Sequence, residues 1–496
     1  MANDNGGIIG IINTPTADTA SGVWSLDSQY QAQTTGTWPP IPAIGLNSAR
    51  FNSGSSDNLS RNFTSGDRQT FTISAWVKRS SVANPSQSVI SAGSGGDKNY
   101  LHFENGALSF ERYNAGFVFQ LITNRVFRDT SAWYHIVVAY DSTQATASNR
   151  IKMYVNGVQE TSFAQANYPT QNYNSVFNTS GYTNFISKES DNNNYFNGYM
   201  SDVNFVDGQA LDPTSFGAFN ANGVWTPIPL TVSSYGTNGF RLKFENSANL
   251  GEDSSPNGNN LTVNNLTSVD QSGDYPVNNF ATLNSLIPMR GTPTYSNGNT
   301  FFSSNYGDWD SALSTIGVTK GKWYFETKWG NPEHLIIGCV DVEKDPEFLS
   351  AQGTVGFLGY QGGIGYLGEA NAPRVIGNSG NNLYTSLTSI SSGDIVGCAI
   401  DLDNREMFVN INGTYTNSGN PATRANPYDM SSSINLGGTV LMGVSSRSGY
   451  SIETNFGHPA YAVASGNADG NGYGNFEYTV PSGYYSLCTK NLAEFG

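Results

Sequence analysis

Apolar and polar residues alternate with a period of two over many short stretches of the chain from about residue 48. Every second residue is apolar in the segments 71–77, 136–140 and 151–155, a pattern typical of strands that bury one face. The segment 199–205 is expected to behave in the same way, with one face formed by Tyr199, Ser201, Val203 and Phe205. The pattern predicts an antiparallel sheet structure in the first half of the chain.

A second group of predicted strands begins near residue 295. Trp323, Phe325 and Trp329 fall on one face of a strand, and the segments 335–340 and 407–411 are further strands. An Asn-Gly pair follows a strand in each half of the chain, at 156–157 and 412–413. Because Asn and Gly tolerate the positive φ angles of two-residue hairpin turns, both pairs predict tight turns between antiparallel strands.

The composition agrees with an all-β protein. Of the 496 residues, 55 are Gly and 57 are Asn, whereas charged residues make up only 13%. Gly and Asn are turn residues, and the Ala, Glu, Lys and Leu-rich stretches of helical proteins are missing from the sequence.

The formal net charge of −15 excludes the basic surface that nucleic-acid or anionic-membrane binding requires. Cys339, Cys398 and Cys488 are too few and too far apart for a disulfide framework or a metal knuckle. We expect them to be small buried residues. No apolar stretch is long enough for a membrane-spanning helix.

At roughly 150 residues per domain, the length suggests about three folding units. We expect two antiparallel β-sandwiches of the jelly-roll type, at 46–222 and 291–496, with an extended arm at 1–45. The segment 223–290 contains one predicted strand at 240–244 and a run rich in Asn, Ser and Gly at 246–279. We expect it to be a connector with little core of its own.

The predicted arm carries large apolar residues in a segment too small to bury them. We therefore expect it to contact another domain, another subunit or another partner, through Ile8, Ile9, Ile11, Ile12, Trp24 and Trp38. The isoleucine cluster is equally compatible with an edge strand. The start of the chain lacks the features of an export signal, so synthesis in a cytoplasm is expected.

Four phrases in the first half resemble a laminin G-like domain of the concanavalin A type. They are the segments 71–78, 133–138, 153–157 and 196–203. In the second half, residues 321–326, 337–339, 393–401 and 407–410 resemble a SPRY-type sandwich.

The pairing of these two domains, joined by the phrases at 252–260 and 278–284, is similar to large virion proteins of tailed phages. The resemblance implies a tail fibre, tail spike or head fibre that is released by lysis. It also implies a homotrimer, because phage fibres are commonly trimeric. The localisation implied is the virion, with no nucleic acid bound and no membrane insertion.

Sandwiches of this kind bind glycans by stacking aromatic rings on sugars, with loop amides holding the hydroxyl groups. The aromatic residues in predicted loops are therefore candidate sites for a host-surface glycan: Tyr168, Tyr173, Tyr182, Tyr195, Phe196, Trp309, Tyr360 and Tyr366.

Related jelly rolls also hold calcium, and Asp97 with the run 191–194 offers oxygen ligands for this ion. No other cofactor is expected. Glu343, Asp345 and Glu347 have the spacing of glycosidase carboxylates, but Pro346 is incompatible with a central strand. We expect a solvated loop there and no enzyme activity. The histidines lack ligand spacing, and His135 is expected to be half-buried in a strand.

The sequence thus predicts a virion structural protein, a tail-fibre or head-fibre adhesin that binds host carbohydrate through loops of rigid sandwiches. One alternative is a capsid or tail decoration protein that binds no receptor. Another is a polysaccharide depolymerase, which would use the carboxylates near Glu343.

Overall fold

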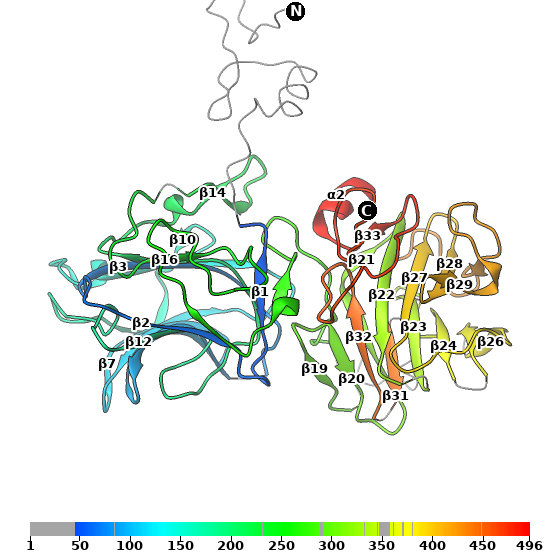
Figure 1. Cartoon of the computed structure of the whole chain (residues 1–496), viewed down its shortest axis with the longest axis horizontal. Coiled ribbons are helices and arrows are strands. Elements are labelled where there is room, and N and C mark those ends of the chain that lie inside the picture. Colours follow the sequence, from blue (N-terminus) through cyan, green and yellow to red (C-terminus); the bar gives the residue numbers. More distant parts are fainter. Residues whose placement is uncertain are drawn as a thin grey trace, which may run out of the picture.

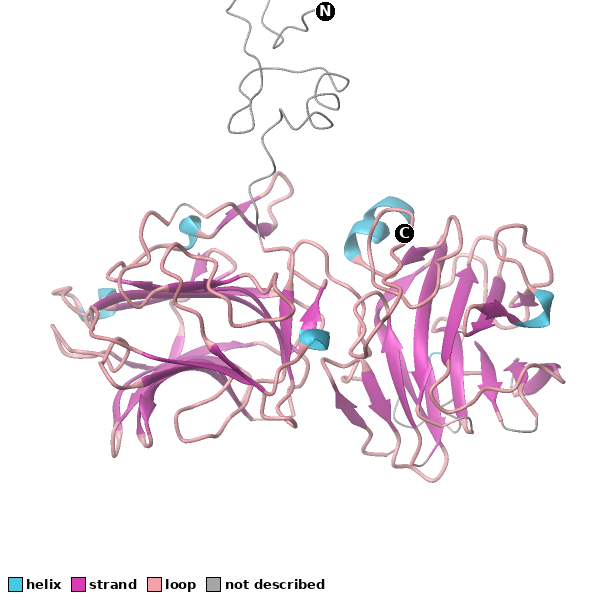
Figure 2. Ribbon diagram, viewed as in Figure 1, coloured by secondary structure: helices cyan, strands magenta, loops and turns pink. Residues whose placement is uncertain are grey.

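The computed structural model describes residues 45–496 except 84, 231, 288–290, 332, 345, 347–357, 361, 370–371, 379 and 448. In this part of the chain the fold is nearly all β and forms two lobes that lie side by side (Figures 1 and 2). The predicted fold class is confirmed. No helix of the described residues is long and apolar enough to cross a membrane.

The first lobe packs two sheets, A and B, face to face. In spatial order, sheet A contains β10 (Val158–Gln159), β9 (Ile151–Val155), β8 (Tyr134–Asp141), β3 (Thr70–Arg79), β13 (Gly198–Asp207), β1 (Ser48–Phe51) and β18 (Gln271–Ser272), and β16 (Phe240–Leu242) also pairs with β13. Sheet B contains β11 (Phe163–Asn167), β7 (Phe117–Val126), β6 (Ala107–Tyr113), β5 (Asp97–Glu104), β4 (Ser86–Ser94), β12 (Thr183–Ile186), β2 (Asn58–Asn62) and β17 (Thr262–Asn264). Their inner faces form one apolar core.

The second lobe repeats this architecture with sheets C and D. Sheet C contains β19 (Thr294–Ser296), β20 (Phe301–Ser303), β32 (Ser451–Asn455), β22 (Lys322–Trp329), β27 (Ile395–Asp401), β28 (Glu406–Ile411) and β29 (Thr414–Tyr415), with β30 (Tyr428–Asp429) on β28 and β33 (Tyr485–Ser486) on β22. Sheet D contains β21 (Trp309–Val318), β31 (Val440–Arg447), β23 (Leu335–Asp341), β24 (Gly363–Gly368), β25 (Arg374–Gly377) and β26 (Asn381–Tyr384).

Short elements complete the lobes. A hairpin of β14 (Gly217–Phe219) and β15 (Trp225–Pro227) lies over sheet A, and the helix α2 (Thr489–Phe495) lies near the junction of the lobes (Figure 1). Single turns of 3-10 helix fall in loops of the described chain, at Ala147–Asn149, Pro213–Ser215, Ser268–Asp270 and Thr416–Ser418.

The predicted alternation places the expected side chains in the cores. Ile73, Val138 and Met153 lie in the core of the first lobe, and Trp323 and Val409 lie in that of the second. Both Asn-Gly turns adopt positive φ angles, with 49° and 79° at each pair. The three cysteines are buried and unpaired, as expected.

The shared face predicted for residues 199–205 is wrong. The register of β13 against β3 shifts between Ser201 and Asn204, and Asp202 has a φ of 46°. This bulge reverses the alternation, so Val203 and Phe205 point into the core while Tyr199 faces outward.

The segment 223–290 is not a connector without a core. It supplies β16, β17 and β18 to the sheets of the first lobe, and Phe240, Leu261 and Leu266 belong to that core. Ala281 and Leu283 at its end belong to the core of the second lobe. The segment is therefore shared between the lobes.

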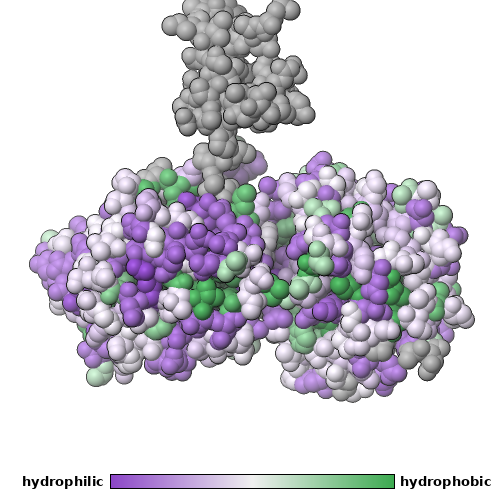
Figure 3. Space-filling view, viewed as in Figure 1, coloured by the Kyte–Doolittle hydropathy of each residue, from purple (hydrophilic) through white to green (hydrophobic). Residues whose placement is uncertain are grey.

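Buried polar contacts lie at the junction of the two lobes. Lys78 on β3 forms an ion pair with Asp274 (2.7 Å), and neither side chain is more than 1% exposed. Arg50 on β1 donates to the carbonyl oxygens of His458 and Pro459, and the Tyr199 hydroxyl donates to that of Gly298. Figure 3 shows a mainly hydrophilic surface, with apolar areas along the middle of the molecule.

Candidate functional site

A wide cleft of about 990 Å³ opens on the outer side of sheet A, beside the junction of the lobes. We call it the tryptophan cleft. Its walls come from sheet A, from the β14–β15 hairpin, from the segment 276–279 and from Thr489. The lining residues that carry the argument are Trp76, Trp133, Trp225, Phe219, Val158, Val224, Asn156, Asn220, Asn279 and Arg125.

An aromatic stack forms the floor of this cleft. Trp76 and His135 are cross-strand partners on the outer face of β3 and β8, and their rings stack with centroids 4.7 Å apart. The Trp225 ring stacks on the other side of His135, at 6.0 Å. Two central strands of sheet A and the β14–β15 hairpin thus deliver three large rings to one place on a rigid sheet.

Hydrogen bonds fix the orientation of this stack. The indole Nε1 of Trp225 donates to His135 Nδ1 (3.0 Å), so the remaining proton of the neutral imidazole lies on Nε2, which contacts Ser74 Oγ (2.9 Å). Burial lowers the pKa of His135 to about 3, so the ring is neutral at physiological pH. His135 is more deeply buried than predicted from the sequence.

Trp225 reaches the sheet because glycines leave room for its ring. A Cβ atom at Gly157 would lie 2.4 Å from the indole, and one at Gly217 would lie 2.5 Å from it. Gly157 also has a φ of 79° in the Asn156-Gly157 turn. The same turn therefore ends the β9 strand and leaves space for the Trp225 ring.

Exposed apolar side chains form the rim of the cleft. Phe219, Val224 and Val158 are 54%, 56% and 58% exposed. The Phe219 ring meets the Trp225 ring edge-on, with centroids 5.0 Å apart. Such a cluster on a surface is typical of a place where a ligand or partner binds.

Polar groups stand between these apolar ones. Asn156 Oδ1 accepts from the backbone N–H of His135, and Asn220 Oδ1 accepts from those of Asn222 and Val224. Arg125 at the rim pairs with Glu160 (3.0 Å). None of the described lining residues is a carboxylate, so the cleft offers stacking and hydrogen bonding but no acid–base pair.

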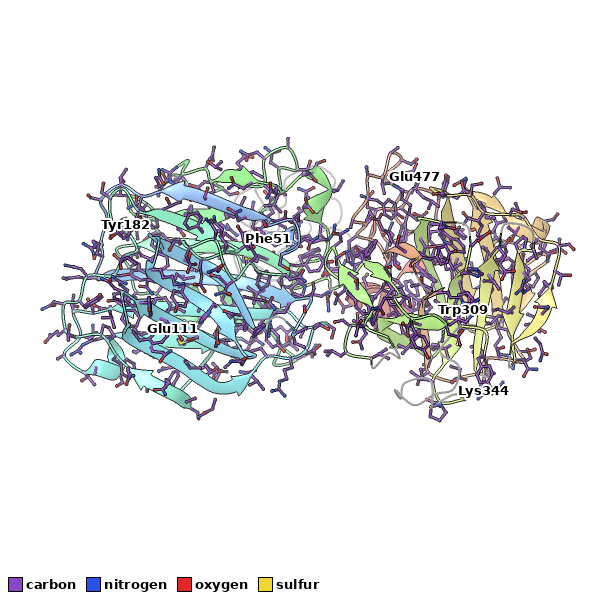
Figure 4. The ribbon with its side chains drawn as sticks, turned by 90° about the horizontal axis from the view of Figure 1, so that it is seen from below. Phe51, Glu111, Tyr182, Trp309, Lys344 and Glu477 are labelled. Carbon is purple, nitrogen blue, oxygen red and sulfur yellow. The ribbon has the colours of Figure 1, made fainter. Side chains whose placement is uncertain are left out.

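The predicted glycan-binding residues are not brought together. Tyr182 and Trp309 lie in different lobes (Figure 4). Tyr168, Tyr173 and Tyr182 are partly buried against the core of the first lobe. Tyr195, Trp309 and Tyr360 are half-buried, and Trp309 contacts the His334 ring. None of the eight lines the tryptophan cleft.

Two of these predictions are wrong. Phe196 and Tyr366 have no exposed area, because each belongs to the core of its lobe. The Tyr366 hydroxyl donates to the carbonyl oxygen of Thr388. Neither ring is available to a sugar.

The sequence pattern does not indicate a binding site at the residues that line the tryptophan cleft. Phe219, Val224 and Trp225 flank the turn at 220–223, and apolar residues beside a polar turn are the signal that could have drawn attention to them. That they meet Trp76 and His135 depends on contacts about 90 or more residues apart, which no local pattern contains.

The residues proposed for calcium do not fit that ion. Lys98 on β5 forms ion pairs with Asp191 (2.8 Å) and with Glu189, and Asp97 is paired with Arg112. Tyr182 also donates to Asp97. Side-chain cations already occupy the positions that a calcium ion would need, and the described residues contain no cluster suited to a metal.

The possible carboxylate trio is only partly described. Glu343 lies exposed in a turn after β23 and accepts from Thr439 Oγ1 (2.6 Å), in agreement with the expected loop. Asp345 and Glu347 lie outside the described residues, as do the proposed assembly residues Ile8, Ile9, Ile11, Ile12, Trp24 and Trp38.

A second group of buried charged residues lies on the outer face of sheet B. Glu111, labelled in Figure 4, accepts from Tyr100 and Gln120, and His102 lies 3.7 Å from it. Hydrogen bonds and His102 lower the pKa of Glu111 to about 2, despite the opposing effect of burial. Every described charge here has a partner, so we assign this group a structural role.

Comparison with known proteins agrees with the fold. Residues 52–215 match the family described as the Concanavalin A-like lectin/glucanases superfamily. No curated protein sequence matches the chain.

Three solved structures are similar in part. The SPRY domain of human HERC1 has a TM-score of 0.24 and 17% identity, over 33% of this chain and 91% of its own. The TRIM65 PSpry domain has a TM-score of 0.26 and 11% identity, over 35% of this chain and 91% of its own. The CBM40 of Ruminococcus gnavus IT-sialidase, bound to α2,3-sialyllactose, has a TM-score of 0.22 and 16% identity, over 30% of this chain and 91% of its own. By the family match of residues 52–215, the sandwich of the first lobe is similar to the Concanavalin A-like lectin/glucanases superfamily.

Proposed function

We propose that this chain is a carbohydrate-binding adhesin of a virion, of the tail-fibre or head-fibre kind, and that the tryptophan cleft is its sugar-binding site. The observation that carries the binding proposal is the open cleft in which Phe219 presents an exposed ring beside Trp225. The match of residues 52–215 to a family of lectins and glucanases supports the same class of ligand.

The geometry favours a sugar over a wholly apolar partner. A pyranose has one apolar face that stacks on an aromatic ring and a periphery of hydroxyl groups that needs hydrogen-bond partners. The rim supplies both, because Phe219 lies next to the amide-bearing Asn220. Since no carboxylate lines the cleft among the described residues, we propose binding without cleavage.

The virion role completes the proposal. A homotrimer attached to the particle by the segment 1–45 would present several copies of a weak site to a host surface, and linked weak sites bind with high avidity. The net charge of −15 is compatible with this role and unfavourable for binding to nucleic acid.

Substitution of Phe219 by Ala tests the cleft. We expect the full-length chain to bind one or more oligosaccharides on a glycan array, and Phe219→Ala to weaken that binding at least tenfold, because the exposed stacking surface is lost. Isothermal titration with the best oligosaccharide measures the loss.

The matched control is Phe117→Ala. Phe117 is 57% exposed in the same lobe and also meets one aromatic ring, that of Tyr113, but lies outside the cleft. Its substitution should leave binding unchanged. Equal loss in both variants, or no bound glycan at all, contradicts the proposal.

A further inference from the structure

A separate cleft of about 420 Å³ lies on the second lobe, at the end of the β28–β29 hairpin. We call it the tyrosine cleft. Its walls are the hairpin turn, the loop that follows β29 and the segment 478–481. The lining residues are Asn410, Gly413, Tyr415, Gly419, Asn420, Pro421, Ala422, Tyr478, Thr479 and Pro481.

Tyr478 is held over this cleft by its backbone. The N–H groups of Glu477 and Tyr478 both donate to the carboxylate of Glu326 (2.9 Å each), a fully buried residue of β22. The Tyr324 hydroxyl donates to the same carboxylate (3.0 Å). Burial raises the pKa of Glu326 to about 7. The buried Glu326 carboxylate thus fixes the segment that carries the tyrosine.

The Tyr478 ring packs against the hairpin turn. Gly413 has a φ of 79°, and a Cβ atom there would lie 2.7 Å from the Cδ1 atom of Tyr478. The ring therefore packs on the bare backbone of the Asn412-Gly413 turn, and its hydroxyl lies 3.4 Å from Asn412 Oδ1. One face of the ring is supported by the protein, as in a stacking platform.

The rest of the lining is polar but uncharged. The Tyr415 ring is half-buried, and its hydroxyl interacts with the side chain of Asn410. Asn420 stands at the exposed rim, where its Oδ1 accepts from the backbone N–H of Ala422 and Thr423. No lining residue carries a formal charge.

We propose that the tyrosine cleft binds a neutral pyranose ring, stacked on Tyr478 and hydrogen-bonded to the side-chain amide of Asn420. The absence of charge among the lining residues disfavours phosphates and acidic sugars, and the NH2 group of the Asn420 amide at the rim can donate to a sugar hydroxyl. This site is independent of the tryptophan cleft, which lies on the other lobe and has Arg125 at its rim.

The test uses the full-length chain and the neutral hexoses glucose, galactose and mannose. Saturation-transfer NMR should detect at least one of them as bound, and titration should give a millimolar dissociation constant. Tyr478→Ala should abolish the signal, whereas Tyr478→Phe should retain it because the ring remains. Tyr306→Ala removes a partly exposed tyrosine of the same lobe outside the cleft and should have no effect.

A second variant guards against misfolding of Tyr478→Ala. Ala422 is exposed, so Ala422→Arg adds bulk and charge to the cleft without disturbing the core, and it should also abolish binding.

The same titration separates this inference from the proposed function. Hexose binding that survives Ala422→Arg and disappears in Phe219→Ala would overturn the inference while supporting the tryptophan cleft. Binding lost in Ala422→Arg and retained in Phe219→Ala supports the inference, whatever the glycan array gives. No hexose bound at 50 mM or so, far above millimolar affinity, would also overturn it.

Discussion

At the scale of single residues, buried neutral histidines link the structure to pH. His135 lies within an aromatic stack, and His458 lies between the lobes with its Nε2 at 3.0 Å from the carbonyl oxygen of Ala281. Burial lowers the pKa of His135 to about 3 and that of His458 to about 4, below the ordinary value of 6.5. Below pH 6.5 the unfolded chain binds protons that the folded chain excludes. The free energy of unfolding therefore decreases as the pH is lowered.

We expect each of these histidines to remove about 2 kcal/mol from the free energy of unfolding between pH 7.5 and pH 5. His135→Gln should remove the His135 share of this pH dependence, because glutamine does not titrate. Urea unfolding of the two proteins at both pH values measures the difference. A slope with pH that is unchanged in the variant would contradict the neutral, buried imidazole.

At the scale of elements, the period-two pattern was sufficient to locate the long strands but not the short ones. Strands such as β17 and β18 are two or three residues long, which is too short for any periodicity. At the bulge, Asp202 pairs at 2.6 Å with Arg241, which lies on a strand 39 residues away. Both failures share a cause, because the deciding contact is not local in sequence.

The hairpin turn at Gly157 also determines where the Trp225 ring lies in the tryptophan cleft. The substitution Gly157→Ala tests this dependence. The new methyl group would meet the Trp225 ring, so we expect a loss of about 2–4 kcal/mol in stability and a displaced tryptophan. The intrinsic fluorescence of the folded protein should change accordingly.

Gly208→Ala is the control for backbone strain alone. Gly208 has a φ of 84°, close to that of Gly157, but a Cβ atom there would find no heavy atom within 4 Å. It should lose only about 1–2 kcal/mol and leave the fluorescence unchanged. Equal effects in the two glycine variants would mean that the Trp225 contact contributes nothing.

At the scale of the whole molecule, the lobes are joined by charges buried far from water. The Lys78 ammonium contacts Asp274, the Asn279 side chain and the carbonyl oxygen of Phe280. The indole of Trp133 donates to the other oxygen of Asp274 (3.1 Å). Sequence patterns indicated two sandwiches but not this joint, since Lys78 and Asp274 are 196 residues apart and each looks like an ordinary surface residue.

We expect Lys78→Met to lower the free energy of unfolding by about 3–5 kcal/mol, because it leaves the Asp274 carboxylate buried without its cation. The double variant Lys78→Met/Asp274→Leu should recover a large part of this loss. Calorimetry or chemical denaturation provides the measurement.

Lys243→Met is the comparison. Lys243 forms a 2.8 Å pair with Glu245, which is 44% exposed, and loss of such a pair should cost less than about 1 kcal/mol. Similar losses in the free energy of unfolding for Lys78→Met and Lys243→Met would show that water reaches the Lys78–Asp274 pair.

A joint of this kind does not act as a hinge. Opening it would leave Arg50 and Lys78 without the carbonyl oxygens of His458, Pro459 and Phe280 that they now contact, a cost far above thermal energy. The distance between the two clefts is therefore fixed. A polysaccharide that occupies both clefts would have to match this distance with its repeat length, so it would be selected by its repeat length as well as by its sugars.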